Sequence, residues 1–555
     1  MSSPPDTALV TGLVRDTLPY TRLPWIRSLV HVYAHDFASI ASLFAGDPAQ
    51  PDAWRTTIAR VQRQARGDRR DRIAALVTAQ LRRRDAPAAA FESAERLARP
   101  DAVAVVTGQQ AGLFGGPLYT WFKAISTQQL ARRDEQEHGV PVVPVFWVDA
   151  EDHDWDEVST AHLLDRESAP SAITLEPVVG CGTHPMAAIT LDAQVDTALA
   201  TLEETLPPTE FTTELLATLR RCYRTGESMA GAFARWMDAL LGPHGLVVFE
   251  SNDPAAKPIA AEVFAGELAH PGRTVRLARE AGAAMAAAGH SPQIEPAGDQ
   301  VGVFRLDAQG RLSIRIADGD CLVGDRPISR DALIADSRSH PEHFSPNVLL
   351  RPIVQDTLFP TVGYIAGPSE LAYHAQLGGI YEAFGVERPL LASRASATLL
   401  DSAAARFLDR YDLPFESLQS QDESALNRLL GALLPASVEE AFDETERLTT
   451  EQAARLREVV TAVDPTLAGA VDTTLERMRD TLNTLHGKIL QARKKKDETL
   501  RRQFMRTRNL TFPNGSPQER ALSIAFFANR YGPGLSGRLL EALPTLADRH
   551  YLITP

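Results

Sequence analysis

An apolar run, a glycine-rich turn and a helix follow one another early in the chain, and this order most constrains the fold. Residues 102–106 (AVAVV) are short, apolar and rich in valine, as in strands buried on both faces. Residues 107–116 (TGQQAGLFGG) form the turn, and a helical pattern runs from Pro117 to about residue 138. A second apolar run covers residues 140–148. This order predicts a βαβ unit with a right-handed crossover, and therefore a parallel sheet.

The same pattern recurs further along the chain. Apolar runs at residues 245–250, 361–366 and 389–392 predict three more strands, and helical patterns follow the first two, ending at about residues 268 and 384. We therefore predict an α/β fold with a Rossmann-like, doubly wound core of five parallel strands.

The sequence around these strands divides into parts of different character. Residues 1–100 are expected to supply the N-terminal helical part of the core, and residues 101–395 the Rossmann-like core itself. Two insertions, at about residues 155–240 and 270–340, would form lobes on this core. The second insertion contains a predicted β-hairpin, made by residues 301–306 and 311–316.

Strand signals stop at about residue 396. Apolar residues from Leu467 to Ile489 recur at spacings of three and four, close to a heptad seam, and Asp464-Pro465 separates them from an earlier helix. We predict an α-helical coiled-coil dimerisation domain over residues 396–510, built on an antiparallel hairpin whose second helix runs from residue 466 to about 507. Residues 511–555, with a last helix at 517–531, are expected to return to the core.

Composition excludes several classes of protein. The chain of 555 residues is 44% hydrophobic and 23% charged, which is typical of folded chains with several structural units. A net charge of −14 disfavours nucleic acid and anionic membranes as partners. Three separated cysteines exclude a disulfide framework and a zinc ribbon, and no window approaches the ~18 apolar residues of a membrane span. We therefore expect a cytoplasmic protein with no membrane partner.

The turn at residues 107–116 is the first candidate binding site. It places backbone N–H groups at a helix N-terminus on the carboxyl edge of the sheet, which favours an anion. It matches neither the Walker pattern nor a clean GxGxxG, so a purely structural turn is the alternative. Two glutamine amides count against that alternative, because they can donate to and accept from a polar ligand. The next helix carries a tyrosine and a lysine four residues apart, on one face that could point back to the turn. The alternative for the lysine is that it is merely solvated. The candidate binding residues are Gln109, Gln110, Gly112, Gly115, Gly116, Tyr119 and Lys123.

An acidic cluster, residues 149–154 (DAEDHD), follows the second strand. Four carboxylates and one imidazole suit general acid/base catalysis, because neighbouring charges shift the pKa of each group. Asp152 and His153 are the candidate catalytic residues. A divalent cation is the lesser alternative, and we assign no metal, because the spacing matches no specific metal motif. The structural alternative is an acidic loop with a helix-capping aspartate.

Asn347, Arg351 and Gln355 precede the strand at residues 361–366 and are candidate binding residues. At helical spacing they would line one face, with Arg351 as a fork for a carboxylate or phosphate. Pro352 argues against a continuous helix there.

The turn at residues 367–370 (GPSE) follows the same strand. Ser369 could bind an anion and Glu370 could hold an amine, which makes Glu370 a candidate catalytic residue. Glu370 is equally well explained as a first-turn residue favoured by the helix dipole. We interpret Tyr373 and His374 as packing or surface residues.

Five segments of this sequence resemble a known family. They are residues 106–119 (VTGQQAGLFGGPLY), 144–154 (PVFWVDAEDHD), 350–355 (LRPIVQ), 365–370 (IAGPSE) and 512–515 (FPNG). In this order they resemble the bacillithiol biosynthesis cysteine-adding enzymes, the BshC family, over nearly the whole chain. The resemblance implies a Rossmann-type core with connecting-peptide insertions, a coiled-coil arm that makes a homodimer, and a likeness in shape to class I aminoacyl-tRNA synthetases.

The resemblance also implies a reaction. A ligase of this family joins the carboxyl group of L-cysteine to the amine of glucosaminyl malate, the last step in the synthesis of bacillithiol, a low-molecular-weight thiol. Amide formation needs an activated acyl group, and an acyl-adenylate made from ATP with magnesium is one hypothesis. No HIGH, KMSKS or Walker motif is present, so the sequence leaves the activating cosubstrate open. On this hypothesis the turn from Gln109 to Gly116 and Lys123 hold phosphate, Asp152 or His153 takes the amine proton, and Arg351 binds the malate carboxylate.

A different class of function is the alternative. Residues 488–508 contain nine basic side chains against two acidic ones, which would suit a coiled-coil scaffold or nucleic-acid adaptor with a non-catalytic Rossmann core. A solvated coiled-coil face is the commoner outcome for such a segment. The net negative charge of the chain as a whole disfavours nucleic acid as a partner.

Overall fold

The computed structural model describes residues 12–64, 68–317, 319–434, 436–496 and 498–555. The chain forms two compact units. The first comprises the described residues up to Leu399 together with Pro517–Pro555, and the second is Leu400–Ser516.

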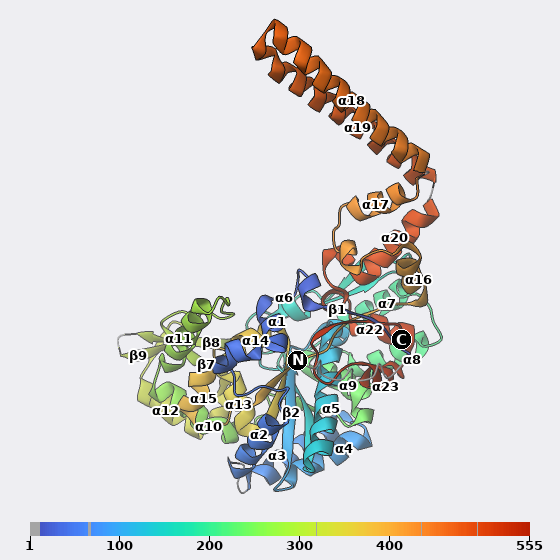
Figure 1. Cartoon of the computed structure of the whole chain (residues 1–555). Helices are drawn as coiled ribbons and strands as arrows, with labels where there is room; N and C mark the ends of the chain where they lie inside the picture. The colour runs from blue at the N-terminus through green and yellow to red at the C-terminus, as the bar shows by residue number, and fades with distance from the viewer. Residues whose placement is uncertain (1–11, 65–67, 318, 435, 497) are drawn as a thin grey trace. The chain divides into compact units, whose positions relative to one another are not determined.

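A five-stranded parallel sheet forms the core of the first unit (Figure 1). Its strand order is β13-β12-β2-β3-β6, and every neighbouring pair is parallel. This confirms the predicted doubly wound core, because each strand coincides with one of the five apolar runs. The strands are β2 (Val103–Gln109), β3 (Val142–Val148), β6 (Val247–Glu250), β12 (Thr361–Ala366) and β13 (Leu390–Ser393).

Helices α2 (Pro51–Gln64) and α5 (Leu118–His138) pack against this sheet. Trp54 of α2 and Leu130 of α5 share one buried cluster with valines of β2 and β12. A Cβ atom at Gly363 of β12 would lie 2.9 Å from the Trp54 ring, so the close approach of α2 to the sheet requires glycine there. Since α5 joins β2 to β3, the glycine-rich turn before it lies at the carboxyl edge of the sheet.

A second, antiparallel sheet forms the lobe of the later insertion. Its order is β10-β9-β8-β7-β11, and it contains the predicted hairpin as β7 and β8. Its strands are β7 (Gln300–Asp307), β8 (Gly310–Ala317), β9 (Asp320–Val323), β10 (Arg326–Ile328) and β11 (Phe344–Pro346). Helices α10 (Lys257–Ala269) and α12 (Arg330–Ser339) pack together beside it. The sequence predicted two of these strands, because the other three are only three or four residues long.

A third sheet corrects two expectations. Residues 1–100 were expected to be helical, but β1 (Val14–Pro19) is a strand and pairs antiparallel with β15 (Arg549–Ile553). Strand signals were expected to stop at residue 396, yet β14 (Ser396–Leu399) pairs parallel with β15. Both short segments depend on a partner far away in the sequence, so neither has a local pattern that identifies it.

Two predicted helices are interrupted. The helix expected at 517–531 is two helices, α21 (Gln518–Ala521) and α22 (Ile524–Tyr531), and the side chain of Ser523 caps the second by accepting from Ala525 N. The helix expected to end at Phe384 is likewise divided into α14 (Pro368–His374) and α15 (Gly378–Phe384). The other elements of this unit are α1 (Ser28–His35), α3 (Arg69–Arg84), α4 (Ala88–Glu95), α6 (Trp155–Val158), β4 (Thr160–Leu164), β5 (Pro170–Thr174), α7 (Gln194–Thr205), α8 (Thr212–Cys222), α9 (Met229–Leu241), α11 (Arg273–Ala287), α13 (Arg351–Leu358) and α23 (Leu535–Ala542).

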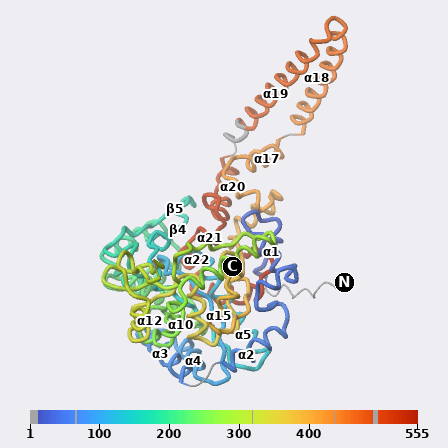
Figure 2. Tube along the Cα trace, turned by 90° about the vertical axis from the view of Figure 1, so that its left-hand side faces the viewer, coloured from blue at the N-terminus to red at the C-terminus, as the bar shows by residue number. Residues whose placement is uncertain are grey.

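The second unit is helical, and its longest helices form the predicted antiparallel hairpin. Helices α18 (Ala436–Val463) and α19 (Ala468–Lys496) run side by side (Figure 2), and the Asp464 side chain caps the short turn between them. The second helix, predicted as one element to residue 507, is described as α19 and α20 (Glu498–Thr511), and residue 497 lies outside the described residues. Helices α16 (Ser402–Tyr411) and α17 (Ser424–Ala432) complete this unit.

Candidate active site

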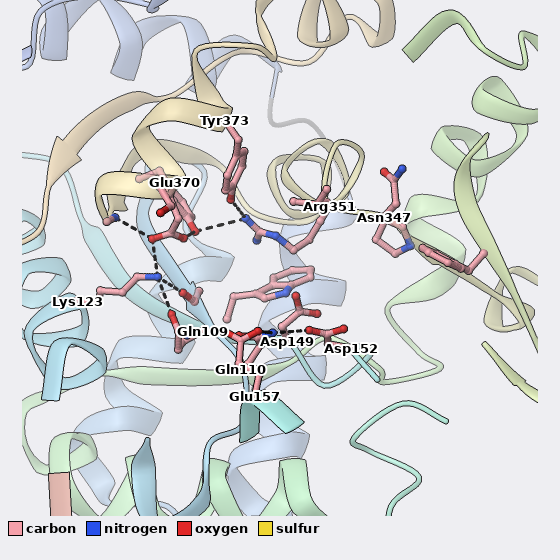
Figure 3. Close-up of a pocket in the computed structure, with 18 of the residues that line it drawn as sticks. Gln109, Gln110, Lys123, Asp149, Asp152, Glu157, Asn347, Arg351, Glu370 and Tyr373 are labelled. Carbon is pink, nitrogen blue, oxygen red and sulfur yellow. Dashed lines mark hydrogen bonds and ion pairs between the residues drawn. The ribbon is translucent and has the colours of Figure 1, made fainter. Parts of the chain in front are cut away.

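A cavity of about 610 Å³ lies at the carboxyl ends of β2, β3 and β12 (Figure 3). The chain leaves β2 towards β3 on one side and reaches β12 on the other, so the cavity lies at the point where the strand order reverses. The β7–β8 hairpin and the segment before α13 also contribute to its wall. Its lining contains five basic and four acidic side chains: Lys123, Arg311, Arg351, Arg394 and Arg520, and Asp149, Asp152, Glu157 and Glu370.

Of the candidate glycines, Gly112, Gly115 and Gly116 do not line this cavity, whereas Gly108 of the same turn does. Gly115 has a φ of +99°, and a Cβ atom there would lie 2.7 Å from Trp236 Nε1. The backbone N–H of Gly115 donates to the buried Tyr223 hydroxyl at 3.1 Å. Tyr223 in turn donates to the Gly112 carbonyl. Gly112 and Gly116 instead line an adjacent cavity of about 240 Å³, together with Gln109, Gln110 and Tyr119. The structure therefore divides the predicted turn between two neighbouring spaces.

Both glutamine amides of the turn are held by neighbouring side chains. Gln109 donates from Nε2 to the Tyr119 hydroxyl at 3.3 Å. Gln110 donates from Nε2 to Asp152 Oδ2 at 2.6 Å and to Glu157 Oε2 at 2.7 Å. Gln110 therefore links the turn to the acidic cluster that follows the next strand.

Lys123 is buried, so the interpretation of a solvated lysine is wrong. Its ammonium lies 2.7 Å from Glu370 Oε2 and donates to Gln109 Oε1 at 3.1 Å and to the Gly108 carbonyl. Burial lowers the pKa of Lys123, and Glu370 opposes this shift. Burial by itself would raise the pKa of Glu370, but the Lys123 ammonium and hydrogen bonds from Tyr364 and Gly367 N hold that pKa below its usual value. Glu370 thus holds an amine that belongs to the protein itself.

Arg351 is the centre of a second buried group. Its guanidinium donates to the Tyr373 hydroxyl at 2.8 Å, to Gln355 Oε1 at 3.0 Å and to the Tyr364 hydroxyl at 3.4 Å. Tyr373 was interpreted as a packing or surface residue, but its hydroxyl positions Arg351 and its side chain lines the cavity. Gln355 lies behind Arg351 and is not part of the lining.

Asn347 does not share a helix face with Arg351. Helix α13 begins at Arg351, so Pro352 occupies its first turn, where proline is tolerated. Asn347 precedes the helix, and its Oδ1 accepts from the N–H groups of Leu349 and Leu350. Asn347 still lines the cavity, as does Ser369 at the start of α14.

The acidic cluster divides into three roles. Asp149 and Asp152 line the cavity, and burial together with the charge of Asp152 raises the pKa of Asp149 to about 6. Glu151 is buried elsewhere in an ion pair with Lys257. Asp154 caps α6 by accepting from Glu157 N at 3.2 Å, which is the capping role considered for this loop.

His153 does not line the cavity. Its Nδ1 lies 3.2 Å from Arg311 Nη1 and 3.6 Å from Asp152 Oδ1. Burial and the nearby Arg311 guanidinium lower its pKa. The imidazole therefore contacts a lining arginine from behind.

Several lining residues were not found from the sequence. Arg311 starts the return strand of the hairpin and donates to Ser345 Oγ at 3.0 Å and to the Pro346 carbonyl at 2.7 Å. Arg394 is buried against Glu519, 2.8 Å away, a residue 125 positions later. Glu157, Tyr364 and Arg520 also line the cavity. No local motif surrounds these residues, because the contacts that bring them to the cavity are long-range.

The basic segment at residues 488–508 is partly engaged within its own unit. Arg506 pairs with Asp401 at 2.7 Å, and Arg508 donates to the Gln421 and Asp422 carbonyls. The side chains of residues 493–496 lie outside the described ones. Among the described helices, none is long and apolar enough to cross a membrane.

Comparison with known proteins gives consistent matches over most of the chain. The family described as "Bacillithiol biosynthesis BshC, N-terminal Rossmann-like domain" matches residues 16–395, and its "C-terminal coiled-coil domain" matches residues 397–555. A relative from Salinibacter ruber, named "Putative cysteine ligase BshC", is 32% identical over 94% of this chain and 95% of its own length. Relatives of the same name from Chlorobaculum tepidum (33% identity, 88% of this chain and 89% of the relative) and Koribacter versatilis (31%, 97% and 100%) are similarly close.

Proposed function

The chain belongs to the BshC family of bacillithiol biosynthesis, and from this premise we propose that it joins the carboxyl group of L-cysteine to the amine of glucosaminyl malate. It is a ligase that forms a carbon–nitrogen bond, and its relatives carry the name "Putative cysteine ligase BshC". The observation that carries the proposal is the charge arrangement of the 610 Å³ cavity at the reversal of the strand order. Acidic groups there can accept a proton, and basic groups there can bind an anionic substrate.

The basic side chains suit the malate part of the acceptor. Arg351 is 8% exposed, and its three side-chain partners are neutral groups, so its positive charge is not cancelled by direct ion pairing with any of them. A guanidinium held in this way can bind a carboxylate through two parallel hydrogen bonds. Arg311 from the lobe also lines the cavity, with its Nη1 3.7 Å from Asp152 Oδ1. We assign the malate carboxylates to these two arginines.

Asp152 is the candidate acceptor of the amine proton. Its carboxylate is 24% exposed, lines the cavity and is oriented by Gln110. As the amine attacks the acyl carbon, the nitrogen loses one proton, and a carboxylate within hydrogen-bond reach can take it. His153 lies behind the lining and acts on this step only through Asp152 and Arg311. Glu370 is assigned to positioning Lys123.

The carboxyl group of cysteine must be activated before it can form an amide. We propose an acyl-adenylate, formed when the cysteine carboxylate attacks the α-phosphate of ATP and displaces pyrophosphate; the amine then displaces AMP. The adjacent cavity beside Gly112 and Gly116 is the proposed position for phosphate, with Gln110 and Tyr119 in the wall that both cavities share.

The direct test is product formation. Purified protein is incubated with glucosaminyl malate and cysteine, with and without ATP and magnesium, and bacillithiol is detected by mass. Product with ATP and none without it supports both proposals. Product that is independent of ATP would overturn the adenylate alone, and the absence of product in every mixture would overturn the ligase assignment for these substrates.

We also propose that the hairpin of α18 and α19 makes a homodimer. Several large apolar side chains on it are exposed, among them Leu456 (54%), Val459 (67%) and Met478 (49%). Exposed apolar surface of this kind favours a partner helix. Light scattering of the full chain should give twice the mass of 60.5 kDa, and Leu456→Glu should shift the protein towards the monomer.

A further inference from the structure

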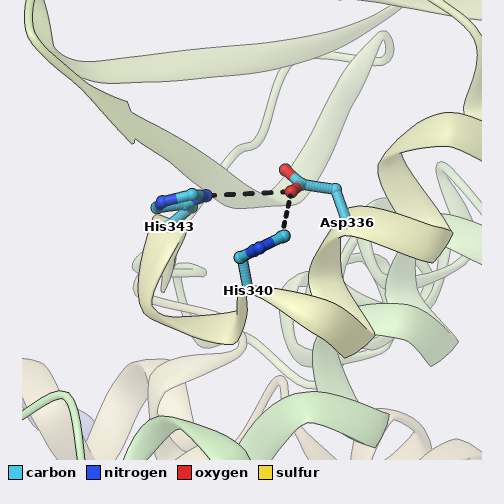
Figure 4. Close-up of side chains that lie close together, drawn as sticks. All are labelled: Asp336, His340 and His343. Atoms are coloured by element: carbon cyan, nitrogen blue, oxygen red, sulfur yellow. Dashed lines mark hydrogen bonds and ion pairs between the residues drawn. The ribbon is translucent and has the colours of Figure 1, made fainter.

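Three potential metal ligands meet at the end of α12, in the lobe of the second sheet (Figure 4). Asp336 and His340 are four residues apart at the last turn of that helix, so their side chains project from one face. His343 ends the short turn Pro341–His343 and directly precedes β11. The cluster is separate from the cavity described above, because none of the three residues lines it.

Two of the three ligand-atom distances are close to those expected around zinc. Asp336 Oδ1 lies 3.2 Å from His340 Nδ1 and 3.7 Å from His343 Nδ1, and the three ligand atoms are all within 4.8 Å of one another. Tetrahedral zinc with bonds of about 2.0–2.1 Å separates its ligand atoms by about 3.3 Å. Small side-chain rotations would therefore complete three of four positions.

The surrounding residues orient these ligands. Arg305 binds the other carboxylate oxygen, Asp336 Oδ2, at 2.9 Å, which leaves Oδ1 directed at the two imidazoles. Nδ1 of His343 is inaccessible to solvent and has no hydrogen-bond partner within the described part of the chain. A buried nitrogen lone pair or N–H without such a partner is costly, and a metal bond would satisfy the nitrogen. Arg305 also lowers the affinity for a cation, and His340 Nδ1 would have to give up its contact with Ser339 Oγ.

We propose that Asp336, His340 and His343 bind one Zn²⁺ ion, with water as the fourth ligand. Two imidazoles and one carboxylate favour zinc over magnesium or calcium, which prefer oxygen ligands throughout. Both histidines are partly exposed, at 56% and 41% of their side chains, so solvent can reach the fourth position.

The bound ion would have a structural consequence for the cavity. It would tie the end of α12 to β11, whose Ser345 and Pro346 hold the lining residue Arg311. The site therefore stabilises the segment that positions one wall of the cavity. It supplies no group to the reaction itself.

Two other clusters serve as comparisons. Asp134, Glu137 and His138 also lie close together, but Arg133 pairs with Asp134 at 2.6 Å and contacts Glu137 at 3.8 Å. His31 and His35 are four residues apart with ring centroids at 4.8 Å, and among the described residues no carboxylate joins them in a group of three ligands. His35→Gln is therefore a matched control that removes one histidine of a neighbouring pair.

The test is zinc binding by the full chain after treatment with EDTA, measured by titration calorimetry with ZnCl₂. We expect one ion per chain, and at least tenfold weaker binding in His340→Gln and His343→Gln, because each loses a direct ligand. His35→Gln should bind as the wild type does. Zinc should also raise the melting temperature of the wild type and of His35→Gln, but not that of His343→Gln.

Three results would overturn the proposal. The first is that the wild type does not bind zinc. The second is that His340→Gln and His343→Gln bind zinc as tightly as the wild type. The third is that His35→Gln loses zinc binding. Circular dichroism of each apo variant shows whether it is folded, and both target histidines are exposed enough that glutamine should be accommodated. None of these measurements depends on ligase activity.

Discussion

The two sides of the cavity differ in how their charges are balanced. On one side, Lys123 and Glu370 form a buried ion pair, and Arg351 is held by neutral hydroxyl and amide groups. On the other side, Gln110 links Asp152 to Glu157, and Asp149 lies near them (Figure 3). Burial raises the pKa of Asp149 and of Glu157 on that side, whereas Lys123 holds the pKa of Glu370 down.

This difference separates positioning from proton transfer. A satisfied ion pair keeps its charges at neutral pH and fixes the geometry around it. Burial makes the carboxylates of Asp149 and Glu157 bind protons more readily, and groups on this side are the ones expected to exchange a proton with a substrate. The four predictions below test this contrast, from the largest expected effect to the smallest.

Lys123→Met should remove the buried ion pair between Lys123 and Glu370 on the positioning side of the cavity. It leaves Glu370 as a buried carboxylate without its cation, and we expect the free energy of unfolding to fall by about 3 kcal/mol. The measurement is denaturant unfolding. The double variant Lys123→Met/Glu370→Leu should recover part of the loss, because no unpaired charge remains.

The control for that prediction is the exposed pair Arg276–Glu280, whose side chains are 60% and 58% accessible. Arg276→Met should change the free energy of unfolding by less than about 0.5 kcal/mol. Equal losses at the two sites would show that Lys123 and Glu370 do not form a stabilising buried pair.

Asp152→Asn should remove the group that we propose accepts the amine proton on the other side of the cavity. We expect kcat to fall by about 10²- to 10³-fold with little change in stability, because the amide cannot accept the amine proton. Asp154→Asn is the matched control, since asparagine also caps helices and Asp154 does not line the cavity. A kcat within twofold of wild type for Asp152→Asn would remove Asp152 from the proton-transfer step.

Asp149→Asn should change how the free energy of unfolding depends on pH, because it removes the carboxyl group whose pKa is raised on the acidic side of the cavity. The pKa of Asp149 is raised from 3.8 to about 6 in the folded chain, so folding favours its protonated form. Its contribution to stability is complete below pH 4 and is lost as the pH rises through about 6. Relative to Asp149→Asn, the wild type should lose roughly 1 to 3 kcal/mol between pH 4 and pH 7. Parallel curves of unfolding free energy against pH would contradict the raised pKa.

His153→Gln should have the smallest effect. The imidazole contacts Arg311 from behind the lining, so we expect kcat to fall by less than about tenfold. The shape of the pH profile for kcat should be preserved. A loss as large as that of Asp152→Asn would transfer the role of proton acceptor to the histidine.

Much of the core could be predicted, whereas the site could be predicted only in part. Five buried parallel strands are each a continuous apolar run, because both of their faces are covered. Strand β1 could not be found in this way, since it is half exposed and pairs with β15 near the other end of the chain. In the site, Gln110, Lys123 and Asp152 lie beside strand ends and were recognisable. Arg311, Tyr364 and Arg394 were not, because nothing local distinguishes them from structural residues.

The sequence by itself determined the five buried parallel strands of the core, the edge at which the candidate site lies, and the family. Apolar periodicity and turn chemistry act over a few residues, so a short segment of sequence is enough to predict these features. Only the tertiary structure decided which polar groups meet. It paired Lys123 with Glu370 across 247 positions, placed His153 behind Arg311, and brought Asp336, His340 and His343 together. Such contacts depend on packing between distant segments, which determines which charges are neutralised and which can act.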